Sequence, residues 1–129
     1  MRYYDEIARL ERDGFDVIVD KTWEDISLRD CFDESCYDIE DMERKVNEGD
    51  LDWFMLRVRV LFEGHLFAEE YLGGCLYDWN KVNDVLTDGT AEDLIYTALD
   101  HAKREVHSLA GKLWALQQEL DYADAQPAE

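Results

Sequence analysis

The sequence predicts an α+β fold: an antiparallel sheet of about three strands packed against a long C-terminal helix, with shorter helices outside. Three observations carry this prediction: a β-branched run at residues 15–20, an alternating apolar stretch at 52–62, and a heptad-like apolar repeat over 91–121. The 129 residues contain no linker and no internal repeat. We therefore expect a single domain over residues 1–129, with a flexible tail at about 122–129.

The three expected strands are residues 15–20, 52–62 and 65–72. The first is rich in β-branched side chains, and the second places alternate apolar residues on one face, since successive side chains of a strand point to opposite sides. Glu63-Gly64 is a turn signal between the second and third strands. The sequence leaves open whether this loop has two residues or three with a bulge, and the two registers present opposite faces to the core. Either register places Arg57 or Arg59 near Glu69 or Glu70.

Short helices are expected at three places. Tyr3, Ile7 and Leu10 have helical spacing within residues 3–12, followed by Asp13-Gly14 as a stop signal. Asp38 is a candidate N-cap for a helix over 39–48 that ends at Gly49. A further short helix is expected over 79–86.

The most regular element is residues 91–121, where apolar residues repeat at alternating spacings of four and three. Two interpretations remain open: the seam covers the sheet, or part of it pairs with a second copy of the chain. The second interpretation assigns self-association to Val106, Leu109, Leu113, Trp114, Leu116 and Leu120.

The net charge is −19, from 32 acidic and 13 basic residues. Such a surface disfavours direct binding to nucleic acid or anionic lipid and suits a basic protein partner. The charge is concentrated in residues 15–50, which carry −9, and within them residues 29–50 hold nine carboxylates against three basic side chains. The sequence has no apolar run long enough for a membrane span and no signal-peptide pattern, so a cytoplasmic protein is expected.

Neither a metal site nor an active site is predicted. Cys31 and Cys36 lack a second pair at zinc spacing, and Cys75 could join them only through folding. The three histidines have no ligand spacing, and "YLGGCLY" at 71–77 lacks the residues of a phosphate-binding loop. We expect free thiols, no cofactor and no enzymatic activity.

The carboxylates of residues 29–50 have two interpretations: a solvated acidic surface, or one that mimics the charge density of nucleic acid and occupies the basic groove of a nucleic-acid-binding protein. In the second interpretation Trp23 and Tyr37 add apolar contacts at the rim. The acidic candidates are Asp30, Asp33, Glu34, Asp38, Glu40, Asp41, Glu43, Glu48 and Asp50.

In size, charge and aromatic content, and in this acidic run, the chain resembles the small acidic inhibitors that phages and mobile elements direct against host defences. That group includes DNA-mimic anti-restriction and anti-CRISPR proteins. The resemblance is one of kind, without a shared motif or fold. It implies a non-enzymatic inhibitor that blocks the nucleic-acid site of a host defence protein. The alternative is an acidic assembly subunit that oligomerises through residues 91–121, with possible homodimers.

Overall fold

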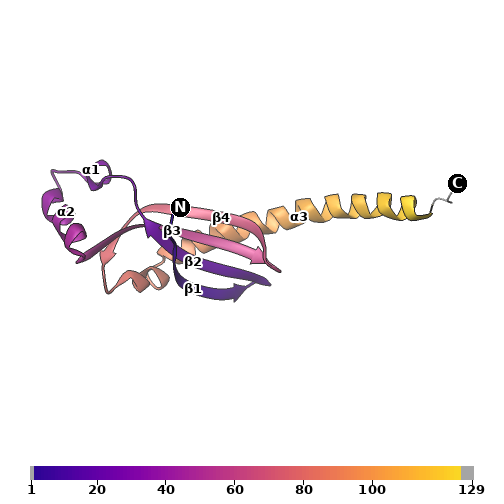
Figure 1. Cartoon of the computed structure of the whole chain (residues 1–129), viewed down its shortest axis with the longest axis horizontal. Coiled ribbons are helices and arrows are strands. Elements are labelled where there is room, and N and C mark those ends of the chain that lie inside the picture. The colour runs from indigo at the N-terminus through magenta and orange to yellow at the C-terminus, as the bar shows by residue number, and fades with distance from the viewer. Residues whose placement is uncertain (1, 126–129) are drawn as a thin grey trace.

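A computed structural model describes residues 2–125 as a four-stranded antiparallel sheet, in the order β1-β2-β3-β4, with α3 packed across one face (Figure 1). The strands are β1 (Asp5–Arg12), β2 (Phe15–Trp23), β3 (Leu51–Phe62) and β4 (His65–Asp78). Helices α1 (Leu28–Cys31) and α2 (Ile39–Glu48) lie between β2 and β3. A 3-10 turn, η1 (Val82–Leu86), precedes α3 (Thr90–Ala125). The α+β class is confirmed, with one strand more than expected.

The additional strand is β1, so the helix predicted over residues 3–12 is wrong. Asp13 and Gly14 both have positive φ, 54° and 87°, and join β1 to β2 as a two-residue hairpin turn. This Asp-Gly pair was interpreted as a helix stop, but such a pair also favours the turn type that matches strand twist. The bulge between Glu6 and Ala8 shifts the strand by one residue. Ile7, Ala8 and Leu10 can therefore all pack against the core without strict alternation.

The β3–β4 register is that of a two-residue loop. Glu63 and Gly64 have φ of 50° and 77°, and Phe62 pairs with His65. Arg59 consequently lies opposite Glu69, while Arg57 lies opposite Tyr71. The expectation that a basic residue of β3 lies near Glu69 or Glu70 is confirmed for Arg59.

The core lies between one face of the sheet and the first three turns of α3. Val17 and Val19 of β2 and the even-numbered residues 54–60 of β3 are buried there. Small and branched side chains of α3 meet them: Ala91, Ile95, Ala98, Leu99 and Ala102 are all buried. Phe62, the last residue of the expected apolar row, is 49% exposed because it adjoins the hairpin turn.

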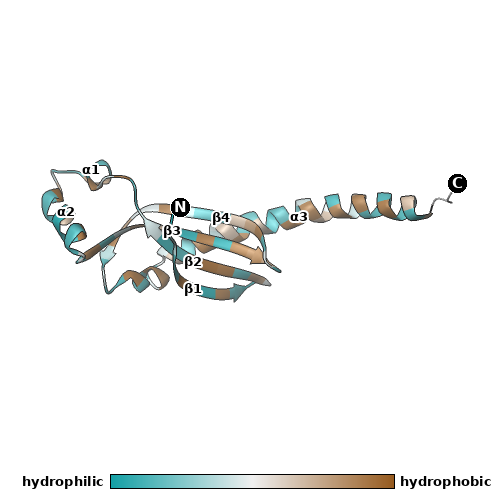
Figure 2. Cartoon of the chain, viewed as in Figure 1, coloured by the Kyte–Doolittle hydropathy of each residue, from teal (hydrophilic) through white to brown (hydrophobic). Residues whose placement is uncertain are grey.

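Helix α3 extends far beyond this contact (Figure 1). Its 36 residues correspond to about 54 Å at 1.5 Å per residue. Residues 103–125, which we call the distal segment, are exposed except for the half-buried Leu109. Apolar residues nevertheless continue along this part of the helix (Figure 2). The helix extends to Ala125, so residues 122–125 of the expected flexible tail are helical, and residues 126–129 lie outside the described residues.

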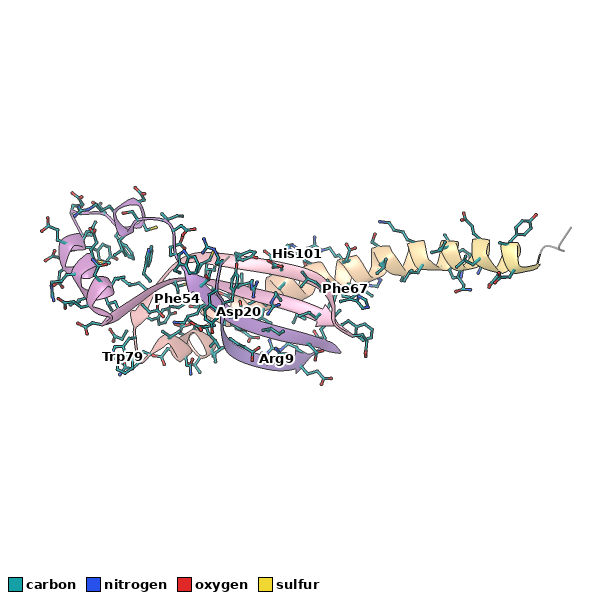
Figure 3. The ribbon with its side chains drawn as sticks, in the orientation of Figure 1. Arg9, Asp20, Phe54, Phe67, Trp79 and His101 are labelled. Carbon is teal, nitrogen blue, oxygen red and sulfur yellow. The ribbon has the colours of Figure 1, made fainter. Side chains whose placement is uncertain are left out.

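The opposite face of the sheet carries a buried charge cluster centred on Asp20, in the middle of the sheet (Figure 3). Asp20 is 2% exposed and accepts hydrogen bonds from Arg57 at 2.7 and 2.6 Å and from Arg59 at 3.2 Å. The Tyr4 ring lies 3.5 Å from the Arg57 guanidinium, and the hydrogen bond to Asp20 is the main reason why the pKa of Arg57 is raised. The two arginines of β3 are therefore neutralised by β2 rather than by β4.

Candidate binding surface

Residues 24–50 form an acidic lobe at the end of the molecule opposite the distal segment (Figure 1). Ser27 caps α1, since its hydroxyl accepts a hydrogen bond from the Arg29 amide. Asp38 caps α2 by accepting from the Asp41 amide at 3.1 Å, as expected. Gly49, with φ of 84°, ends α2 in the left-handed conformation that glycine adopts without strain. The predicted range 39–48 is therefore confirmed.

The lobe is attached to the sheet through aromatic and hydrogen-bond contacts. The Trp53 indole of β3 donates to the carbonyl of Ile26 at 2.8 Å, and its ring lies 5.9 Å from that of Phe32. Leu28 and Ile39 are buried, at 5% and 3% exposure. These contacts hold both helices of the lobe at a defined place beside the sheet.

A second attachment is the carboxylate of Glu24, which bridges the lobe and β4. It accepts hydrogen bonds from the Ile26 amide at 3.1 Å and the Gly74 amide at 2.9 Å. A Cβ on Gly73 would lie 2.7 Å from this carboxylate, closer than real Cβ atoms approach an oxygen. Gly73 therefore leaves room for the bridge, which is a specific role for the double glycine.

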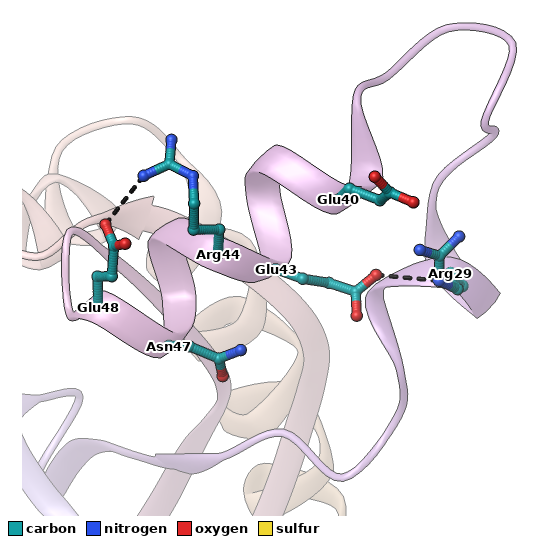
Figure 4. A pocket seen from close by; sticks show the side chains of 6 residues that line it. All are labelled: Arg29, Glu40, Glu43, Arg44, Asn47 and Glu48. Atoms are coloured by element: carbon teal, nitrogen blue, oxygen red, sulfur yellow. Dashed lines mark hydrogen bonds and ion pairs between the residues drawn. The ribbon is translucent and has the colours of Figure 1, made fainter.

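Four of the nine predicted acidic residues are paired inside the lobe. Arg29 contacts Glu34 at 2.8 Å and Glu43 at 3.0 Å, and Arg44 contacts Glu48 at 2.9 Å; Figure 4 shows the Glu43 and Glu48 pairs. Asp41 forms ion pairs with both Arg44 and Lys45. The pKa of Asp41 is lowered, chiefly by its hydrogen bond from Arg44. All three basic side chains of residues 29–50 therefore form ion pairs with carboxylates of the same lobe.

The other five predicted acidic residues form no ion pair with any residue in the described range 2–125: Asp30, Asp33, Asp38, Glu40 and Asp50. All five are exposed. Asp38 serves as the α2 cap, and Asp33 accepts from the Ser35 amide at 2.9 Å, a hydrogen bond that lowers its pKa. Among the described residues, the carboxylates of Asp30, Glu40 and Asp50 neither form an ion pair nor accept a hydrogen bond from a backbone amide.

The two predicted rim aromatics are half exposed and lie at the lobe. Trp23, at the end of β2, is 50% exposed and donates to Asp25 at 2.8 Å, with Arg2 over its ring. Tyr37 is 51% exposed and packs edge-on against Phe32 at 5.0 Å. Both rings combine apolar surface with a fixed orientation.

A shallow hollow of about 390 Å³ lies on the lobe, lined by Arg29, Glu40, Glu43, Arg44, Asn47 and Glu48 (Figure 4). Its charges are mixed and largely paired with one another. Among residues 2–125, no group of three or more histidine, cysteine and acidic side chains is arranged to hold a metal ion.

The thiols and histidines do not converge on a common site. Cys31 and Cys36 are exposed, while Cys75 of β4 is buried in the core. Burial raises the pKa of the Cys75 thiol to about 11, which disfavours the nucleophilic thiolate. His101 contacts Glu70 of β4 across the α3–sheet interface.

The predicted self-association residues all lie on the distal segment. Leu109 is half-buried, whereas Val106, Leu113, Leu116, Leu120 and Trp114 are 37% to 68% exposed. The sequence did not point to the Asp20 cluster, although one signal was present: an acidic residue at the end of a β-branched run. No helix within the described residues is long and apolar enough to cross a membrane.

No family model, curated protein or solved structure matches this chain.

Proposed function

We propose that this protein is a non-enzymatic inhibitor, of the anti-CRISPR or anti-restriction type, that acts in the host cytoplasm. Its acidic lobe binds a basic nucleic-acid-binding host protein and blocks the nucleic-acid site. The observation that carries the proposal is the set of five exposed carboxylates on the lobe that form no ion pair among the described residues.

The division of the lobe's acids supports this role. Arg29 of α1 connects the loop and α2 through Glu34 and Glu43, whereas the pairs of Arg44 and Lys45 lie within α2. The unpaired acids are then displayed on a supported backbone, much as phosphates are displayed at about one charge per 1.7 Å along duplex DNA. Charges held in place lose little conformational freedom on binding, which favours affinity.

A two-stage experiment tests the proposal. The tagged chain captures proteins from host lysate at low salt; the captured nucleic-acid-binding protein is then purified and titrated. We expect affinity to fall steeply as salt increases, and DNA or RNA to compete with the chain for the same site.

Matched charge reversals locate the binding surface. The lobe variant replaces Asp30, Glu40 and Asp50 with lysine, sparing the α2 cap and every ion pair. The control variant replaces Glu11, Glu63 and Asp84, which are exposed and lie outside the lobe. Each exchange adds two charges, so both variants change from −19 to −13.

We expect the lobe variant to lose at least about 100-fold in affinity and the control variant much less, because close charge pairs across interfaces are worth about 1.5 kcal/mol or more each. Circular dichroism and thermal melting confirm that both variants fold. Equal losses in the two variants, or binding without salt dependence and without nucleic-acid competition, contradict the proposal.

A second candidate function, an acidic assembly subunit, is favoured by the exposed apolar residues of the distal segment. Assembly through α3 is compatible with inhibition through the lobe, because the two surfaces lie at opposite ends of the molecule.

A further inference from the structure

The apolar seam of α3 continues past the sheet, where no other element of the described chain covers it. Val106 is 37% exposed, and Leu113, Leu116 and Leu120 are 53%, 48% and 50% exposed. A helix gains most of its stability in water from packing of its apolar face. The distal segment contains 23 residues with such a face and a glycine at position 111. We therefore infer that another surface covers the apolar face of the distal segment, since an uncovered face would not explain the apolar repeat.

The spacing of the seam indicates another helix as that covering surface. Val106, Leu113 and Leu120 occupy the first apolar position of successive heptads, and Leu109, Leu116 and Ala123 the second. This repeat of 3.5 residues is typical of two helices that wind around one another with interlocking side chains. A flat or irregular partner surface would not require it over 18 residues.

The charges beside the seam distinguish the possible orientations of a second copy. Glu105, Lys112 and Glu119 flank the seam on one side, and Lys103 and Asp124 flank it on the other. In a parallel pair Lys112 would face Gln117, and Glu119 would face Asp124, which is repulsive. No opposite charges would meet in that arrangement.

An antiparallel pair centred between residues 114 and 115 places four of the five flanking charges beside opposite charges, whereas Glu105 gains no basic neighbour. Lys112 of each copy then lies within one turn of Glu119 of the other. Lys103, which also pairs with Asp13 of its own chain at 2.7 Å, lies within one turn of Asp124 of the other copy. The same register aligns the apolar layers: Leu113 with Leu116, Leu109 with Leu120, and Val106 with Ala123. One register therefore aligns the apolar layers and pairs four of the five flanking charges.

We propose that the distal segments of two copies pair in this antiparallel register, so that the protein is a homodimer with one acidic lobe at each end. Residue 102 of one copy lies about 38 Å along the axis from residue 102 of the other. The two folded domains therefore lie at opposite ends of the paired segment.

Sedimentation equilibrium on the full chain tests the dimer itself. We expect the parent to be dimeric at micromolar concentration with little salt dependence. Leu113→Glu should raise the dimer dissociation constant at least about 100-fold, because it brings two carboxylates into an apolar seam. Leu113 is exposed in the monomer, so this variant should retain the domain's circular dichroism and melting temperature.

Trp114→Glu is the matched control. Trp114 is 68% exposed but projects about 130° from the centre of the seam, given 100° per residue. We expect this variant to remain dimeric. This places Trp114 outside the pairing surface, although sequence alone grouped it with the self-association residues.

The orientation is tested by exchanging charges. Glu119→Lys should weaken an antiparallel dimer about 10-fold, because it faces Lys112, and the double variant Lys112→Glu/Glu119→Lys should restore it. In a parallel dimer Glu119→Lys would instead strengthen pairing by contacting Asp124. A parent that stays monomeric, a Leu113→Glu variant that stays dimeric, or a strengthened Glu119→Lys dimer overturns the proposal.

The dimer and the lobe proposals fail independently. Association between copies should respond to Leu113→Glu and hardly to salt, whereas partner binding should respond to the lobe reversal and strongly to salt. If the protein were a monomer and a different protein covered its distal segment, the homodimer proposal would be refuted. The proposal that the acidic lobe binds a partner would be unaffected.

Discussion

The two parts of α3 share one apolar period but have opposite surroundings. In residues 90–102 the seam is buried against the sheet, with Ala98 and Ala102 fully inaccessible. In residues 103–125 the equivalent positions are exposed except for the half-buried Leu109. The difference teaches that a heptad pattern identifies which face of a helix is apolar, but does not reveal which surface covers it.

The largest expected contrast comes from truncating one leucine in each part. Leu99→Ala should lower the free energy of unfolding by about 2–4 kcal/mol, because the side chain is 5% exposed and leaves a cavity. Leu116→Ala, at a position 48% exposed, should change it by less than about 0.5 kcal/mol.

Urea unfolding measures both, in the Leu113→Glu background so that self-association does not contribute to stability. Similar losses for the two substitutions would mean that the distal segment packs on its own domain, contrary to the structure.

A smaller effect is expected at Gly111, the glycine within the distal segment. A Cβ there meets no atom within 4 Å. Gly111→Ala should therefore stabilise the helix by about 0.5–1 kcal/mol through the lower backbone entropy of alanine. Far-ultraviolet circular dichroism of the Leu113→Glu chain should show greater helicity.

Gly49→Ala provides the opposite control, because φ of 84° at that position strains any residue with a Cβ. It should destabilise the protein by about 1 kcal/mol. If Gly111→Ala were also destabilising, the distal segment would not be a free helix.

The smallest expected effect concerns the start of the packed part. The Tyr77 hydroxyl donates to Asp88, which also accepts from the Thr90 amide at 2.9 Å, and these contacts lower the pKa of Asp88, the Tyr77 bond contributing most. Because the folded-state pKa of Asp88 lies below the ordinary value of 3.8, the stabilisation is present above 3.8 and is lost as pH falls from there through the lower folded-state pKa.

Tyr77→Phe should cost about 0.5 kcal/mol at neutral pH, since Asp88 is exposed, and should flatten the acid side of the stability profile. Chemical unfolding between pH 7 and about pH 3 measures the profile. A variant with the parent's slope over the acid range would show that this hydrogen bond does not anchor α3.

Local patterns predicted β2, β3, α2 and most of α3, because each depends mainly on side-chain periodicity and caps. They failed at β1, where residues 3–12 have helical spacing and helix-forming residues. Pairing with β2 outweighed that preference, and the Asp13-Gly14 turn made the pairing short-range. The extension of β4 to Asp78, through Gly73 and Gly74, likewise depends on its pairing with β3.

The acidic surface was predicted by composition, but its internal division was not. Arg29 meets Glu43 only because α1 lies against α2, and that contact depends on Trp53 of β3. Similarly, Asp20 is buried beside Arg57, which lies directly opposite it on the neighbouring strand β3. Charge density can be read from a sequence, whereas charge pairing between distant segments requires the fold.

The Glu24 carboxylate, between the Ile26 and Gly74 amides, has a consequence for how quickly the lobe can be recognised. A lobe tethered only at its two chain ends would sample many orientations, and an approaching partner would meet the right one rarely. Because β4 holds the lobe in one orientation, a larger share of collisions presents the same charges to the partner. Any side chain added at Gly73 would displace this carboxylate and slow recognition without changing the net charge.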